Sequence, residues 1–192
     1  MSTLTLAQAV AVPTVPKVQP AVWLGCLRCY DSGCLVGRWF PCDGIEDVTR
    51  ADVHGGAEHV FSDCEEVWCM DSELLPAGTG EMSQARAAQW GEVYAQVGEA
   101  QWSALLAWVN SGCYVADSDG LPVTSEFEDR FCGSWESECV YVDHAAEEVN
   151  VWDEIAEHLH SYFDLDKWWR DERHGYVIED DGEGGVFVFR SY

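Results

Sequence analysis

The chain has 192 residues, enough for one domain with a sizeable core or for two or three small ones. Its 47% apolar content and ten Trp indicate a folded protein, because disordered acidic chains are poor in aromatic residues. Thirty-five acidic against ten basic residues give a formal net charge of −25, which argues against binding to nucleic acid or to an anionic membrane surface and favours basic proteins or cations as partners.

Residues 1–20 are expected to form a flexible tail, because the N-terminus lacks the basic region of a signal peptide and contains Pro13, Pro16 and Pro20. No stretch approaches the ~18 uninterrupted apolar residues of a membrane span. Nine Cys are an odd number, and their spacing is unlike that of a small disulfide scaffold. We therefore expect a cytoplasmic protein with reduced thiols and no membrane partner.

An N-terminal α/β domain is expected over residues 21–76. Residues 21–30 have the pattern of a strand, residues 31–33 of a turn and residues 34–39 of a second strand, which together predict a hairpin. Residues 65–76 predict a third strand that ends at Pro76.

A helical middle domain is expected over residues 77–125. Apolar residues at helical spacing predict two helices, broken near Gly98 and stopped at Gly112: Ala87, Trp90, Tyr94, Val97, Trp102, Leu105 and Val109. The following segment, DSDGLP, resembles the start of a calcium loop. Leu121 and Pro122 nevertheless occupy the positions where an EF-hand needs an oxygen ligand and a Gly, so a turn is the better interpretation.

An acidic C-terminal α/β domain is expected over residues 126–192, which completes an α+β fold in three parts. Residues 144–163 predict the longest helix, with one apolar stripe formed by Ala145, Val149, Trp152, Ile155, Ala156, Leu159 and Phe163. Residues 176–190 predict a final hairpin around a Gly-rich turn.

Acidic charge is concentrated between residues 51 and 166. Residues 51–166 contain 25 Asp or Glu and only two Arg, which leaves −23 of the formal charge there, and residues 143–166 contain eight carboxylates and no Lys or Arg. Charged residues on a helix face normally alternate in sign, because two like charges one turn apart destabilise the helix by ~0.2–0.5 kcal/mol per pair. The uncompensated carboxylates favour a surface that binds a basic partner over an ordinary solvated face.

Metal binding and catalysis receive little support from the residue patterns. Cys26-x-x-Cys29, followed by Cys34 and Cys42, suggests zinc, but residues three apart on a strand point to opposite faces. Neither a second CxxC nor a nearby His pair completes a ligand set, so buried thiols without a metal or cofactor are favoured. Nucleophile signatures, phosphate-binding loops and HExxH are absent from the sequence, and an enzyme is not expected.

Three stretches together resemble the ArdA antirestriction family. The first, VWLGCLRCYDSGCLVGRWF, is similar to the family's N-terminal pattern at Leu27, Tyr30, Gly33, Gly37 and Trp39, with Asp31 at the usual Asn position. The second, FCGSWESECVYV, matches at Gly133, Trp135, Glu136, Ser137 and Tyr141. The third is YFDLDKWWRD with the later GGVFVFR. The resemblance spans roughly residues 22–190, and the nine Cys and the Gly- and Cys-rich stretch near residues 42–64 depart from it.

The resemblance implies an elongated, three-part protein that forms a dimer and mimics DNA. It would occupy the DNA-binding groove of type I restriction-modification enzymes and would not itself bind nucleic acid. Incoming DNA would then escape cleavage, and whether methylation is blocked too stays open. The carboxylates expected to face the enzyme are Glu126, Glu128, Asp129, Glu136, Glu138, Asp143, Glu147, Glu148, Asp153, Glu154 and Glu157. Two alternatives are an acidic inhibitor of another nucleic-acid-binding defence protein, of the anti-CRISPR or immunity type, and a Cys-based metal-binding protein.

Three of the ten basic residues, Lys167, Arg170 and Arg173, follow the acidic stretch directly. We expect Asp166, Arg170 and Asp171 to form an ion-pair network that holds the long acidic helix against the final hairpin. Because exposed ion pairs contribute only ~0–1 kcal/mol, a buried Trp beneath them should dominate the stability. The residues expected to be structural are therefore Trp39, Trp168 or its neighbour Trp169, Arg170 and Asp171.

Overall fold

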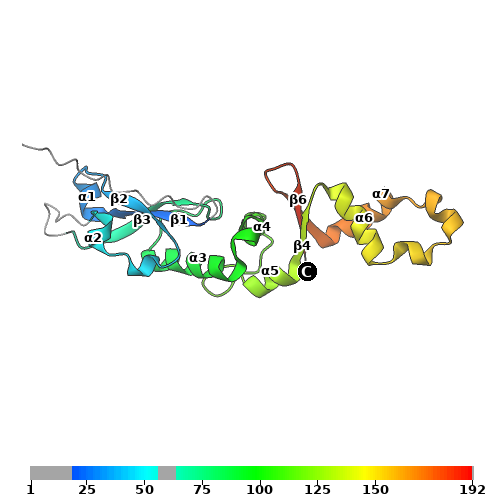
Figure 1. Cartoon of the computed structure of the whole chain (residues 1–192), viewed down its shortest axis with the longest axis horizontal. Coiled ribbons are helices and arrows are strands. Elements are labelled where there is room, and N and C mark those ends of the chain that lie inside the picture. The colour runs from blue at the N-terminus through cyan, green and yellow to red at the C-terminus, as the bar shows by residue number, and fades with distance from the viewer. Residues whose placement is uncertain (1–18, 56–63, 192) are drawn as a thin grey trace, which may run out of the picture.

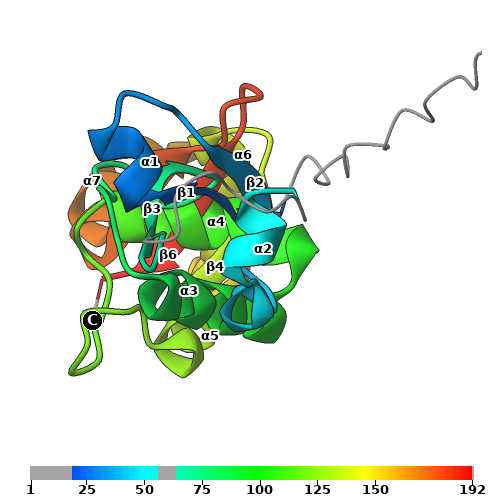
Figure 2. The same cartoon turned by 90° about the vertical axis from the view of Figure 1, so that its left-hand side faces the viewer.

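The computed structural model describes residues 19–55 and 64–191. Two three-stranded antiparallel sheets lie in the two halves of an elongated molecule, and helices connect them (Figure 1). Figure 2 looks along the long axis from the end that carries the first sheet. Helices mixed with small antiparallel sheets confirm the α+β class. The predicted N-terminal tail, except for its last two residues, lies outside the described residues.

The first sheet has the strand order β2-β1-β3, with β1 at Ala21–Cys26, β2 at Gly37–Pro41 and β3 at Val67–Glu73. The predicted strand over residues 21–30 is wrong beyond Cys26, because helix α1 (Leu27–Asp31) begins there. Hydrogen bonds from the Ser32 and Gly33 N–H groups close this helix, and Gly33 takes the left-handed conformation at φ +80°. The CxxC segment therefore spans a strand–helix junction, and the objection that its cysteines point to opposite faces of a strand fails.

Two short elements that the sequence did not suggest connect β2 and β3. They are the 3-10 turn η1 (Ile45–Asp47) and helix α2 (Arg50–Val53). A capping box begins α2: the Thr49 side chain accepts from the Asp52 N–H, and the Asp52 carboxylate accepts from the Thr49 N–H at 2.9 Å. The third predicted strand is confirmed as β3.

The middle of the chain folds as its apolar spacing predicts. Helices α3 (Gln84–Val97) and α4 (Glu99–Asn110) meet at Gly98, whose φ of +80° ends the first helix without the steric penalty that a Cβ would bring. Trp102 is fully buried, and its indole N–H donates to the Leu74 carbonyl at 2.9 Å. The same core includes Val22 of β1 and Phe189 near the C-terminus, so the helices pack against both sheets.

The second sheet has the strand order β4-β6-β5 and follows helix α5 (Thr124–Arg130). The predicted final hairpin is confirmed as β5 (Tyr176–Asp180) and β6 (Val186–Arg190), whereas β4 (Phe131–Trp135) was not predicted. A second core beneath this sheet includes Tyr141, Val142, Ala145, Trp169 and Val188.

The single long helix predicted over residues 144–163 is wrong. Helix α6 (Glu138–Glu148) ends before Asn150, which takes the left-handed conformation at φ +55°. Asn tolerates this conformation better than most residues with a side chain, and the chain then turns through η2 (Val151–Glu154) and η3 (Glu157–Tyr162) before helix α7 (Leu165–Glu172). The expected apolar stripe is consequently broken: Val149 is 58% exposed and Leu159 is 45% exposed.

Candidate functional site

The eleven carboxylates expected to face a partner lie on α5, at the end of β4, and along α6, η2 and η3. Eight of them are exposed: Glu128, Asp129, Glu136, Asp143, Glu147, Glu148, Asp153 and Glu157. Glu126 and Glu138 are half-buried, and the Glu154 side chain lies outside the described part of the structure. The exposure expected from the charge pattern is therefore found for most of the set.

Helix α6 shows how the sequence places carboxylates on the surface. The Ser137 hydroxyl begins the helix by accepting from the Val140 N–H at 3.4 Å. The buried face of the helix consists of Tyr141, Val142, Ala145 and Ala146. Asp143 and Glu147 then lie on the exposed side, one turn apart, where Cβ atoms are separated by ~5–6 Å. The result is a short row of negative charge.

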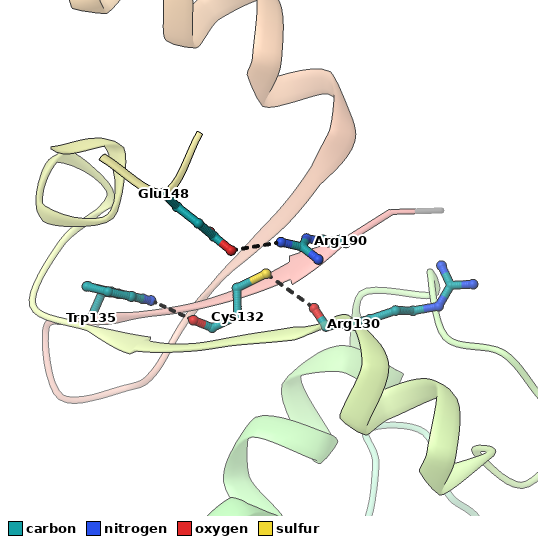
Figure 3. Close-up of polar contacts among 5 residues, drawn as sticks. All are labelled: Arg130, Cys132, Trp135, Glu148 and Arg190. Carbon is teal, nitrogen blue, oxygen red and sulfur yellow. Dashed lines mark hydrogen bonds and ion pairs between the residues drawn. The ribbon is translucent and has the colours of Figure 1, made fainter. Parts of the chain in front are cut away.

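Among the residues that the structure describes, three of the eleven carboxylates form ion pairs. Glu126 binds Arg130 at 3.0 Å, one turn away on α5. Glu138 at the start of α6 binds Arg173 at 2.6 Å, and Glu148 at its end lies 3.4 Å from Arg190 of β6 (Figure 3). The last two pairs attach both ends of α6 to later segments of the chain, so these carboxylates contribute to the scaffold.

Glu138 is the most connected carboxylate of this group. It accepts from the Trp169 indole N–H at 2.8 Å and from Arg173 Nε at 2.6 Å. Burial opposes ionisation, but the two hydrogen bonds and the charge of Arg173 outweigh it and lower the pKa of Glu138. Glu138 therefore remains ionised while it links α6 to α7.

The junction of α5, β4 and α6 is also fixed by polar contacts. The Trp135 indole N–H donates to the Cys132 carbonyl at 3.1 Å, and the Cys132 thiol donates to the Arg130 carbonyl at 3.4 Å (Figure 3). The Trp135 ring packs against His144 with centroids 4.6 Å apart. These contacts hold the start of the acidic segment against the second sheet.

Seven of the eleven carboxylates are exposed and make no ion pair with the described part of the chain. Within residues 19–55 and 64–191, no Lys, Arg or His forms an ion pair with Glu128, Asp129, Glu136, Asp143, Glu147, Asp153 or Glu157. Residues 131–166 contain no Lys or Arg at all. This uncompensated set is the candidate surface, and we refer to it below as the acidic surface.

The expected network of Asp166, Arg170 and Asp171 is not formed in the described structure. All three residues are exposed, and Arg170 makes no ion pair with any residue that the structure describes. Arg173, three residues further along, makes the connection to α6 instead. Charge pattern alone could not distinguish these cations, because the partner Glu138 lies 35 positions away in the sequence.

The aromatic residues expected to be structural differ in their surroundings. Trp169 is only 7% exposed and packs against Tyr141 and Tyr176, with ring centroids 5.7 and 5.2 Å away. Trp168 is half-buried beside it. Trp39 lies opposite Trp23 in the β1–β2 register, but it is 38% exposed and lies on the surface of the first sheet.

Among the described residues, no helix combines the length and the apolar character needed to cross a membrane. No curated protein sequence matches that of the chain. The family model described as Antirestriction protein (ArdA) matches residues 22–183, which include the first sheet except Ala21, the middle helices and the whole acidic surface. A match over most of the sequence establishes to which family the chain belongs. The chain therefore belongs to the ArdA family of antirestriction proteins.

Proposed function

We propose that the protein mimics DNA and occupies the DNA-binding groove of a type I restriction-modification enzyme, so that incoming DNA escapes cleavage. It acts in the cytoplasm as a homodimer and needs no catalytic cofactor. The observation that carries the proposal is the acidic surface: seven exposed carboxylates within residues 128–157 that form no ion pair among the described residues. Membership of an antirestriction family supplies the biological context.

The quantity of charge is consistent with a stretch of duplex. B-DNA carries one negative charge per ~1.7 Å of its axis, which is about two per base pair. The net charge of −25 per chain therefore corresponds to about 12 base pairs, and a homodimer to about twice that length. This is the scale of a DNA segment bound in an enzyme groove.

The chemistry of the partner would favour carboxylates at such positions. Lys and Arg side chains arranged for phosphate oxygens form charge-assisted hydrogen bonds with carboxylate oxygens as well. Attraction between an acidic and a basic surface accelerates association at low ionic strength, and salt screens it. We therefore expect inhibition to weaken as salt rises and to be relieved by competing duplex.

Partner contact is assigned to the acidic surface together with Glu154, whose role is predicted from the sequence. Glu126, Glu138 and Glu148 are assigned to the scaffold instead, because their ion pairs with Arg130, Arg173 and Arg190 occupy them within the chain. Neutralising a scaffold carboxylate should change stability, whereas neutralising the acidic surface should change inhibition.

The experiment is inhibition of a purified type I restriction enzyme cutting unmodified plasmid, with two isosteric quadruple variants. One carries D143N, E147Q, D153N and E157Q, and the matched control carries D31N, E46Q, E66Q and E73Q at exposed positions in the N-terminal part. Four exposed charge pairs at ~0.5 kcal/mol each amount to about 2 kcal/mol, or ~30-fold in affinity. We expect a loss of this order for the first variant and a much smaller loss for the control.

Equal losses in the two folded quadruple variants would contradict the assignment of the acidic surface. Wild-type protein that is folded and does not inhibit at low salt would contradict the proposed target. The same surface would then be tested against another nucleic-acid-binding defence protein.

A further inference from the structure

Three cysteines and one histidine converge beside the first sheet, in the half of the molecule away from α6 and α7 (Figure 1). Cys26 ends β1, Cys29 lies in α1, His54 follows α2 and Cys64 precedes β3. Their ligand atoms, three sulfurs and one ring nitrogen, all lie within 4.8 Å of one another. The three cysteines carry reduced thiols with at most 2% exposure, and His54 is half-buried.

Two of these separations match those of ligand atoms around one tetrahedral ion. Cys29 Sγ lies 3.6 Å from His54 Nε2 and 3.6 Å from Cys64 Sγ. With Zn–S bonds of ~2.3 Å and Zn–N bonds of ~2.0–2.1 Å, tetrahedral geometry separates two sulfurs by ~3.8 Å and a sulfur from a nitrogen by ~3.6 Å. A disulfide needs its sulfurs at ~2.05 Å, so Cys29 and Cys64 are not bonded to each other, and their separation of 3.6 Å fits two ligands of a common centre.

The contacts of His54 orient its ring so that one nitrogen is directed at the thiols. His54 Nδ1 lies 2.7 Å from the Arg50 carbonyl oxygen, and only an N–H group can donate to that oxygen. Nδ1 therefore carries the proton, and the lone pair of Nε2 faces the thiols. A metal-binding His is commonly oriented in this way by a carbonyl at its other nitrogen.

The cysteines are supported from outside the cluster as well. The Arg50 guanidinium donates to the Cys64 carbonyl, which ties the start of β3 to α2. Backbone N–H groups of Cys29 and Arg28 are directed at the Cys26 sulfur. Amide groups directed at a sulfur stabilise its thiolate, which is the form that binds metal.

We propose that Cys26, Cys29, His54 and Cys64 bind one zinc ion at a structural site. Three thiolates and one imidazole form a Cys₃His set, which fills all four tetrahedral positions and leaves none open for catalysis. The ion would fasten α1, the end of α2 and the segment before β3 to β1 at its Cys26 end. In this chain the site would stabilise the first sheet, and it lies apart from the acidic surface.

The test begins with the metal content of the full chain, purified under reducing conditions and supplied with zinc. We expect about one zinc per chain, with four protein ligands. Cys64→Ser should abolish stoichiometric zinc, and Cys64→His should retain it because imidazole also coordinates zinc. Cys34→Ser is the matched control: Cys34 is exposed and outside the cluster, so this variant should bind zinc like the wild type.

A second measurement keeps the proposal testable if Cys64→Ser fails to fold. Removal of zinc from the wild-type protein with a chelator should lower its melting temperature, and added zinc should restore it. Cobalt in place of zinc should give the thiolate-to-metal absorption of a tetrahedral Cys₃His site. Folded, reduced wild-type protein that takes up well under one equivalent of zinc would overturn the proposal, as would a Cys64→Ser variant that keeps wild-type zinc content.

Discussion

Trp169→Ala is expected to destabilise the second sheet far more than the loss of any cation near it. Trp169 is 7% exposed, contacts the rings of Tyr141 and Tyr176, and donates its indole N–H to Glu138. A buried Trp removes ~150–250 Å² from water, worth about 4–6 kcal/mol at ~25 cal/mol per Å². Measured costs of Trp→Ala in protein cores are ~3–5 kcal/mol, and we expect a value in that range.

The nearby cations should contribute much less. The side chains of Arg173 and Glu138 are 50% and 35% exposed, so solvent screens their ion pair and its contribution is ~0–1 kcal/mol. In a chain of this size 1 kcal/mol changes the melting temperature by ~2–4 °C. The expected decreases are therefore ~6–20 °C for Trp169→Ala and at most ~4 °C for Arg173→Ala. Arg170→Ala, at a residue without an ion pair in the described structure, should cause no measurable change.

The assay is thermal unfolding followed by circular dichroism, at low and at high salt. The effect of Arg173→Ala should shrink at high salt, because screening already weakens the ion pair in the wild type. The effect of Trp169→Ala should persist, since it arises from lost burial. A decrease for Arg170→Ala as large as that for Arg173→Ala, or a decrease below ~4 °C for Trp169→Ala, would refute this reasoning.

Three further predictions concern single positions. Gly91→Ala should destabilise the protein by ~1–3 kcal/mol in urea unfolding, because the new Cβ would lie 2.5 Å from the Cys42 carbonyl oxygen. A variant as stable as the wild type would show that α3 does not pack this closely on the chain before η1. Asn150→Val should lower the stability by ~1–2 kcal/mol in the same assay, because residue 150 has a φ of +55°, and Asn150→Gly should not. Equal stabilities of the two variants would contradict the left-handed conformation of residue 150. The Glu138→Gln variant should be less stable to unfolding than the wild type above pH 4.5. This difference in stability should vanish as pH falls through the lowered pKa of Glu138. A difference in stability that does not depend on pH would show that ionisation of Glu138 adds no stability.

The sequence predicted elements well where a residue marks their ends. Gly98 separates α3 from α4 as expected, because a Gly with positive φ is a recognisable end of a helix. The prediction of one long helix over residues 144–163 was wrong because helical spacing of apolar residues also fits a series of short turns. Asn150 was the signal for the break, but an Asn within a helical pattern is a weaker sign than Gly or Pro.

Long-range contacts explain what could not be predicted at the candidate sites. Exposure of the acidic surface followed from its charge, but the ion pair of Glu138 with Arg173 joins residues 35 positions apart. The zinc-type cluster was missed for a similar reason. Its CxxC was noticed, whereas His54 and Cys64 lie 25 and 35 positions from Cys29, and the strand expected over the CxxC appeared to exclude a shared metal. Folding, and not local pattern, brings these groups together.

The most direct test of the central claim is displacement of DNA from a purified type I restriction-modification enzyme. A labelled duplex would be bound to the enzyme, the protein titrated in, and the release of duplex followed by fluorescence anisotropy at several salt concentrations. DNA mimicry predicts complete, competitive release that weakens as salt rises, and a weaker effect for the D143N, E147Q, D153N and E157Q variant. Binding of folded protein to the enzyme while the duplex stays bound would contradict it.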